Sequence, residues 1–172
     1  MKEQGLYSPI FEHENCGAGF ICSLKGVKTN KIIHRALNIL TCLEHRGAVS
    51  SDGRTGDGAG ILIEIPHQFF SKQCDFNLPE PGKYAVGMLF LPQKINQANY
   101  CIKTFEEEIK KQKLNIIGWR DVPINSKIVG LIASKSQPII KQVFISKETK
   151  NQSEQEFNLK LYLARKVAEN KI

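Results

Sequence analysis

The chain has 172 residues, of which 41% are apolar and 24% charged, a balance typical of a folded domain or a large part of one. No apolar run approaches the ~20 residues that a membrane helix needs. The net charge of +7 arises after residue 93, mostly from dispersed lysines. Because nucleic-acid binding favours a compact arginine-rich stripe with aromatic platforms, we expect neither nucleic acid nor a membrane as a partner.

The first residues lack the charged and then apolar pattern of a signal peptide, and they are too acidic for a transit peptide. Residues 17–24 are apolar with two glycines and predict a strand. Apolar residues then recur at helical spacing between residues 32 and 43. This spacing predicts a helix with one buried face, which begins at Thr29 or Asn30 and ends at a glycine cap, Gly47.

A glycine-rich segment follows the helix. Residues 50–60 contain four glycines and therefore predict a loop. Residues 61–65 predict a short strand, and residues 66–70 predict a short helix opened by proline. Two prolines in residues 77–82 mark a turn.

The second half of the chain predicts three strands. Residues 84–91 are continuously apolar, as in a strand buried on both faces, and residues 114–122 and 139–145 also read as strands. Strands and helices do not alternate strictly. We therefore expect an α+β fold, whose strands stack as two sheets with helices outside, rather than a doubly wound parallel sheet.

Two longer helices accompany these strands. Apolar residues at helical spacing predict one over residues 98–109, and a capping box formed by Ser153 and Glu156 opens another. The last helix runs almost to Ile172 without a cap or a tail, so we expect the chain to have been cut from a longer one.

The cysteines predict free thiols in a reducing compartment. Their count is odd, their spacing is irregular, and neither a C-x-x-C pair nor a zinc pattern with histidine occurs. In such a chain, one cysteine with unusual flanks is a candidate nucleophile. The five are Cys16, Cys22, Cys42, Cys74 and Cys101.

Cys16 has those flanks, because it precedes a Gly-x-Gly sequence that leaves room near its sulfur. A thiol needs a base, and removal of residues 1–15 would supply one as the α-amino group of Cys16, with an ordinary pKa near ~8. On local chemistry alone, a buried structural cysteine is the commoner case.

Two further motifs are chemically suggestive. Arg46, in Glu44-His45-Arg46-Gly47, could bind a carboxylate or could only cap a helix. The loop Thr55-Gly56-Asp57-Gly58-Ala59-Gly60 lacks the lysine of a phosphate loop and precedes its strand. We therefore interpret it as a tight loop near the active site.

Taken together, these motifs resemble one known family. The run from Gly5 to Phe20, the segment Cys42-Leu43-Glu44-His45-Arg46-Gly47-Ala48 and the segment from Thr55 to Phe70 resemble the start of the glutamate synthase large chain in wording, order and spacing. The match is dense over residues 5–70 and looser afterwards.

The resemblance implies an N-terminal-nucleophile (Ntn) hydrolase fold with four αββα layers, incomplete at its C-terminal side. It also implies a class II glutamine amidotransferase domain over residues 16–172, behind a propeptide of residues 1–15. Cys16 would be the nucleophile and its freed α-amine the general base. Arg46 would organise the site beside the cysteine, and Gly47 matches the glycine of the same motif.

The resemblance also implies a reaction, in which L-glutamine is hydrolysed to glutamate and ammonia. In the full-length parent, the remainder of the chain would transfer the ammonia to 2-oxoglutarate with flavin mononucleotide (FMN) and an iron–sulfur cluster. Ferredoxin or an NAD(P)H-linked small subunit would supply electrons. We expect no cofactor or metal in residues 1–172, and a cytoplasmic (bacterial) or plastid stromal location.

One departure from the family pattern is important. The family's oxyanion hole uses an Asn-Gly pair, and none occurs in these 172 residues. We therefore expect this chain to be inactive by itself. Two alternatives remain open: another class II amidotransferase, although those usually begin at Met-Cys and lack the glycine loop, and a non-catalytic regulatory or interaction domain on the same fold.

Overall fold

The computed structural model describes residues 17–147 and 152–172. The contacts of the chain divide it into two compact units, Met1–Ile63 and Glu64–Ile172. Cys16 and the predicted propeptide lie outside the described residues. No helix in the described ranges has both the length and the apolar composition required to cross a bilayer.

The first unit contains helix α1 (Asn30–Cys42), followed by the 3-10 turn η2 (Glu44–Arg46). The predicted start is confirmed, since Thr29 is the extended N-cap residue. The predicted glycine cap holds for the 3-10 turn, where Gly47 is the C-cap residue and donates its N–H to Glu44 O at 3.0 Å, but the α-helix itself ends earlier than predicted. Leu43 ends the helix, and Gly47 has a φ of −90°, which any residue can adopt. The apolar side of α1 is half-buried rather than buried.

The strands predicted at residues 17–24 and 61–65 are not formed. Both segments are irregular in the structure, and the side chains of Leu24 and Leu62 are fully exposed. A strand requires hydrogen bonds to a neighbour, and the described residues offer these segments no ladder. Apolar sequence was therefore insufficient to define a strand here.

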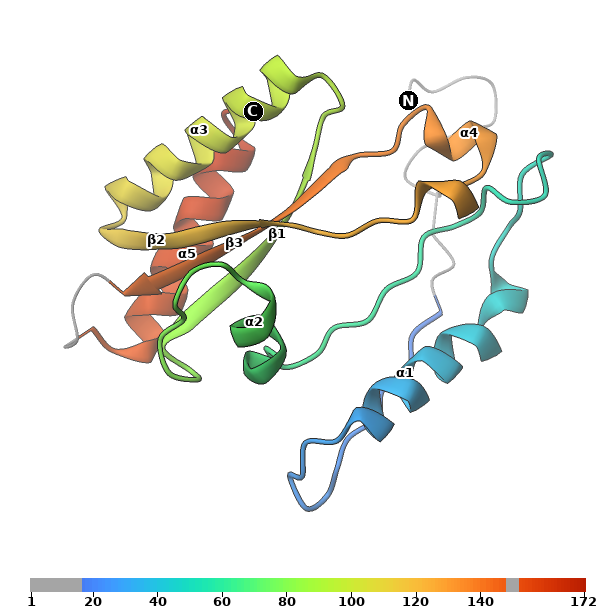
Figure 1. The fold of residues 1–172 in the computed structure, drawn as a ribbon, viewed down its shortest axis with the longest axis horizontal. Helices are drawn as coiled ribbons and strands as arrows, with labels where there is room; N and C mark the ends of the chain where they lie inside the picture. The colour runs from blue at the N-terminus through green and yellow to red at the C-terminus, as the bar shows by residue number, and fades with distance from the viewer. Residues whose placement is uncertain (1–16, 148–151) are drawn as a thin grey trace, which may run out of the picture. The chain divides into compact units, whose positions relative to one another are not determined.

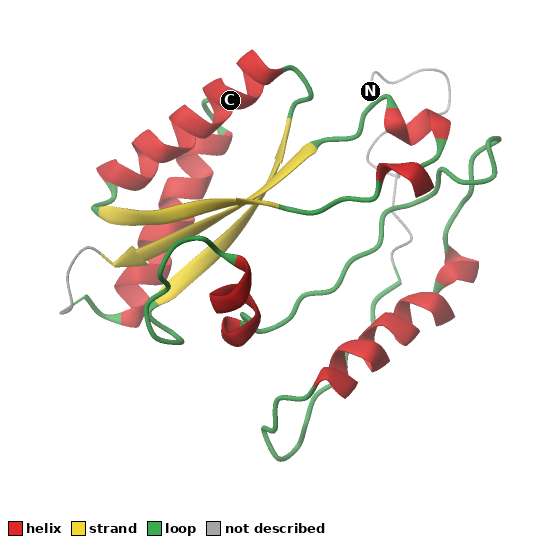
Figure 2. Ribbon diagram, in the orientation of Figure 1, coloured by secondary structure: helices red, strands yellow, loops and turns green. Residues whose placement is uncertain are grey.

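The second unit is built on a three-stranded antiparallel sheet in the order β1-β3-β2 (Figures 1 and 2). Its strands are β1 (Tyr84–Leu91), β2 (Leu114–Asp121) and β3 (Ile139–Lys147). All three predicted strands are confirmed within two residues, and so is the α+β class. The described residues form this one sheet, so the two stacked sheets of the predicted architecture are not both present among them.

Helices α3 (Ile95–Lys111) and α5 (Glu154–Glu169) cover one face of the sheet. The N-cap half of the capping box predicted for α5 is confirmed, because Ser153 Oγ accepts the Glu156 N–H at 3.1 Å, whereas the Glu156 carboxylate pairs with Lys160 at 2.8 Å. Apolar side chains from central β3 and from both helices form the main core. Its buried members are Ile109, Leu114, Val143, Ile145, Phe157 and Ala164.

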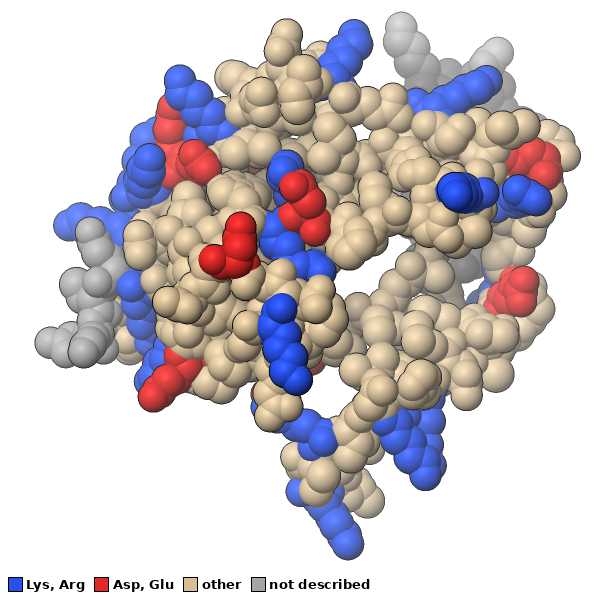
Figure 3. Space-filling view, viewed as in Figure 1, with Lys and Arg blue, Asp and Glu red and all other residues tan. Residues whose placement is uncertain are grey.

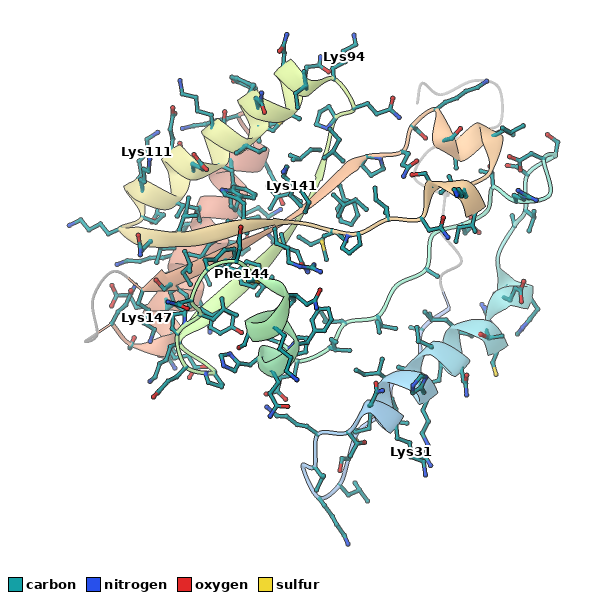
Figure 4. All side chains as sticks on the ribbon, in the orientation of Figure 1. Lys31, Lys94, Lys111, Lys141, Phe144 and Lys147 are labelled. Carbon is teal, nitrogen blue, oxygen red and sulfur yellow. The ribbon has the colours of Figure 1, made fainter. Side chains whose placement is uncertain are left out.

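Helix α2 (His67–Gln73) packs on the opposite face, where Phe144 of β3 is fully buried (Figure 4). The rings of Phe70 and Phe76 meet the Phe144 ring edge-on, at centroid distances of 5.0 and 5.2 Å. Farther along this face, Met88 and Phe90 are exposed. The prediction that β1 is buried on both faces is therefore wrong for its second half.

Two short elements, η3 (Ser126–Ile128) and α4 (Leu131–Ser134), connect β2 to β3. Lysine and arginine side chains are scattered over the face seen in Figure 3, with acidic side chains among them.

Candidate active site

The residue that follows Cys16 lies against Arg46. A methyl group built on Gly17 would be 3.4 Å from Arg46 Cδ and 3.2 Å from Leu43 Cδ2. Cδ is the carbon that carries the guanidinium group. The first unit therefore brings Gly17 close to the His45-Arg46-Gly47 motif, which lies far later in the sequence.

Gly19, the second glycine of the Gly-x-Gly sequence, lies close to α1. A methyl group on Gly19 would be only 2.6 Å from Ile39 Cγ2, which is too close for any real contact. The missing side chain thus allows the backbone of residues 17–19 to lie directly on the half-buried stripe of the helix. Glycine is required here by proximity, rather than by a left-handed backbone.

The glycine-rich loop forms a short hairpin with the segment after Arg46. Val49 and Gly56 form an antiparallel bridge, and the Ser50 N–H donates to Thr55 O at 2.7 Å. A methyl group on Gly56 would be 3.0 Å from Ala48 O, so glycine permits the close approach. The loop predicted at residues 50–60 is confirmed, and it lies beside the His-Arg-Gly motif.

Asp52 shapes the turn of this hairpin. Its Oδ1 accepts the N–H groups of Arg54 and Thr55 at 3.1 and 2.7 Å, and its Oδ2 accepts the Thr55 hydroxyl at 2.6 Å. Gly53, between them, has a φ of 67° and supplies the left-handed residue of the turn.

Asp57 joins the loop to the His-Arg-Gly motif, a contact that the sequence analysis missed. Its Oδ2 accepts the Ala48 N–H at 3.0 Å, and its own N–H donates to Ala48 O at 3.3 Å. Gly47 is adjacent, since a methyl group there would be 3.8 Å from the same carboxylate oxygen. One sequence signal could have identified Asp57, because it is an aspartate between two glycines in the loop that follows the helix.

The predicted site residues thus have different outcomes. Cys16 lies outside the described residues. Arg46 and Gly47 are exposed and lie where Gly17, α1 and the glycine loop meet. His45 faces the helix, with Nδ1 2.9 Å from Cys42 O, which corresponds to a ring N–H donating to the carbonyl.

Several titratable groups of the second unit have shifted pKa values. Hydrogen bonds from Lys111 and Lys171, at 2.7 and 2.6 Å, lower the pKa of the buried Glu108 carboxyl. Burial raises the pKa of the Cys74 thiol and of the Tyr84 hydroxyl. Over the described part of the chain, no three His, Cys, Asp or Glu side chains gather to hold a metal ion.

Comparison with known proteins agrees with the arrangement in the first unit. The sequence profile of the family described as Glutamine amidotransferases class-II matches residues 16–172. The chain is 44% identical over 170 residues to the glutamate synthase [NADPH] large chain of Bacillus subtilis, and the match covers 98% of this chain and 11% of that protein.

Two further relatives carry related names. Glutamate synthase [NADH] of Saccharomyces cerevisiae is 41% identical over 178 residues, which cover 96% of this chain and 8% of that protein. Ferredoxin-dependent glutamate synthase 2 of Synechocystis is 36% identical over 166 residues, 95% of this chain and 11% of that protein. The chain thus spans about a tenth of the length of these relatives.

The profile covers nearly the whole chain. The predicted Ntn hydrolase class follows from the family, of which the described residues supply one sheet and its helices. The chain therefore belongs to the class-II glutamine amidotransferases.

Proposed function

We propose that this chain is the glutamine-hydrolysing part of a glutamate synthase, with Cys16 as the nucleophile of a domain over residues 16–172 and residues 1–15 as a propeptide. The observation that carries the proposal is the contact of Gly17 with Arg46, beside the hairpin of the glycine loop. The family profile supports it, because it begins at residue 16.

The proposed reaction begins when the freed α-amine of Cys16 accepts the proton of its thiol. The thiolate then attacks the side-chain amide carbon of glutamine, forming a carbon–sulfur bond and an oxyanion. Collapse of this intermediate breaks the carbon–nitrogen bond, while the α-ammonium group of Cys16 returns its proton to the departing nitrogen, which leaves as ammonia. Water then hydrolyses the thioester, which releases glutamate and restores the thiol.

Arg46 contributes a fixed positive charge beside the reacting cysteine. Its side chain is exposed, so the guanidinium is accessible to a carboxylate or a carbonyl of a bound substrate. Gly47 has no side chain, so the backbone next to Arg46 remains exposed. The Asn-Gly pair that the family uses to donate to the oxyanion does not occur in residues 1–172.

The rest of the proposed enzyme lies outside this chain. The ammonia would pass to 2-oxoglutarate at a centre with FMN and an iron–sulfur cluster, supplied with electrons by ferredoxin or NAD(P)H. Among the described residues, Cys22, Cys42, Cys74 and Cys101 do not come together as the ligands of an iron–sulfur cluster. A bacterial cytoplasm or a plastid stroma would suit such an enzyme, and one relative is named as chloroplastic.

The test uses the protein expressed from its complete gene. Ammonia release from glutamine is measured for wild type, Cys16→Ala and the matched control Cys42→Ala, whose thiol is exposed. We expect Cys16→Ala to abolish hydrolysis and Cys42→Ala to retain it. A Cys16→Ala protein that still hydrolyses glutamine at the wild-type rate, or a wild type without activity, would contradict the proposal.

A further inference from the structure

We propose that Asp57 is a positioning residue for this site, whose carboxylate fixes the backbone of residues 46–48 and hence the point from which Arg46 projects. The inference rests on the proposed function. It extends that function, because the proposed reaction gives Asp57 no step of bond making or proton transfer.

The hydrogen bonds of Asp57 are unusual for a hairpin. In a regular antiparallel pair, the Ala48 N–H would donate to the main-chain carbonyl of Asp57 while the Asp57 N–H donates to Ala48 O. Here the second bond is present at 3.3 Å, but the side-chain oxygen Oδ2 takes the Ala48 N–H at 3.0 Å. A charged acceptor thus replaces a neutral one at this position, and bonds to ionised acceptors are stronger than those to carbonyls.

This bond is well placed to control Arg46. Ala48 follows Arg46 by two residues, and the intervening Gly47 has no side chain to hold it in place. A methyl group on Gly47 would be 3.8 Å from Asp57 Oδ2, so the carboxylate lies directly against this glycine. The Asp57 side chain therefore restrains a backbone segment that would otherwise have more conformational freedom than most.

The hairpin contains a second carboxylate with a different task. Asp52 accepts the N–H groups of Arg54 and Thr55 and the Thr55 hydroxyl, and so shapes the turn at the far end. The Asp57 bond instead joins the loop to the motif that contains Arg46. Mutation of Asp52 should therefore loosen the turn of the loop, whereas mutation of Asp57 should displace Arg46.

The experiment compares Asp57→Ala, Asp57→Asn and Asp52→Ala in the protein expressed from its complete gene. We expect Asp57→Ala to lower kcat/KM for Cys16-dependent glutamine hydrolysis by ~10- to 100-fold, the order of loss that a misplacement of about 1 Å causes. Asp57→Asn keeps an oxygen that can accept the Ala48 N–H, so it should restore kcat/KM to within about threefold of wild type. Asp52→Ala should lower the melting temperature but retain most of the activity.

Hydrogen exchange at the Ala48 amide gives a second readout. Its protection should fall in Asp57→Ala and persist in Asp57→Asn. Wild-type kinetics in Asp57→Ala, failure of Asp57→Asn to restore activity, or a loss in Asp52→Ala as large as in Asp57→Ala would overturn this inference alone. A wild type without Cys16-dependent hydrolysis would overturn the proposed function and this inference together, so the two failures are distinguishable.

Discussion

Gly17 lies next to Arg46: a methyl group on Gly17 would be 3.4 Å from Arg46 Cδ. Gly17 directly follows Cys16 in the sequence. Gly17 and Arg46 are far apart in sequence, and α1 is the element that brings them together. Arg46 is therefore close to the residue that directly follows the predicted nucleophile.

Arg46 should matter for catalysis and little for stability. Its side chain is exposed, and surface substitutions usually change stability by less than about 0.5 kcal/mol. We expect Arg46→Ala to lower kcat/KM for glutamine by ~10- to 100-fold, as for loss of a preorganised charged group. Arg46→Lys should retain only part of the wild-type kcat/KM, because lysine lacks the planar guanidinium.

The matched control for this prediction is Arg54→Ala in the neighbouring loop, where the side chain is also exposed. It should leave kcat/KM close to wild type. Steady-state ammonia release and thermal melting of all three variants provide the measurement. Equal losses in Arg46→Ala and Arg54→Ala would show that the effect is one of overall charge, and would count against a role at the site.

Gly19→Ala should destabilise the first unit by about 1–3 kcal/mol, the usual cost of overpacking. The added methyl group would be 2.6 Å from Ile39 Cγ2, so the backbone or the helix must shift. Gly58→Ala is the control, because nothing lies within 4 Å of its added methyl group. Urea midpoints measure both changes.

The double variant Gly19→Ala/Ile39→Ala tests the cause of that loss. Removing the Ile39 side chain creates space for the methyl group, so the two changes should cost less together than the sum of each alone. Strict additivity would mean that the contact between Gly19 and α1 does not exist in the folded protein.

Glu108 should make the stability of the second unit depend on pH in the acid range. Hydrogen bonds from Lys111 and Lys171 hold its pKa below that of an unfolded-chain glutamate. Its contribution is therefore fully present above the unfolded pKa and is lost as pH falls through the folded pKa. Lys171 lies just beyond the end of α5, so this contribution joins the segment after α5 to α3.

Glu108→Gln should flatten that dependence, whereas Glu107→Gln, on the exposed side of α3, should leave it close to wild type. Urea midpoints between neutral pH and pH 3 follow the change. A Glu108→Gln protein that loses stability toward low pH as steeply as wild type would show that Glu108 is not responsible.

The 172-residue chain, processed at Cys16, should release ammonia from glutamine very slowly. An oxyanion-hole donor contributes about 2.7–4 kcal/mol to the barrier, and residues 1–172 contain no Asn-Gly pair to supply one. Steady-state ammonia release from the isolated chain, set against the protein from its complete gene, tests this. Similar rates would show that the donors lie within these residues after all.

Elements that carry their own folding signal could be predicted from the sequence. The unbroken apolar run of β1 gave its bounds, and the Ser153 hydroxyl predicted the start of α5 through a bond made within one turn. The order of β1, β2 and β3 in the sheet could not be predicted, because it depends on pairing between strands that are distant in sequence. The β-bulge at Ile116/Gly118 depends equally on pairing between distant residues.

The site was only partly predictable for the same reason. Arg46 and Gly47 were found through a motif. Asp57 was not, because its carboxylate accepts the main-chain N–H of Ala48, and no residue spacing reveals such a hydrogen bond. The strands expected at residues 17–24 and 61–65 failed because apolar composition indicates burial and does not supply a pairing partner. The glycine motifs were correctly identified as unusual, although Gly19 and Gly56 are required by close approach to other atoms.

The most direct test of the central claim is the mass of the mature protein, expressed from its complete gene, before and after reaction with an electrophilic glutamine analogue. The account predicts a chain that begins at Cys16 and gains one adduct, located on Cys16 by peptide mapping and absent from Cys16→Ser. A chain that keeps residues 1–15, or an adduct located on another cysteine, would contradict it.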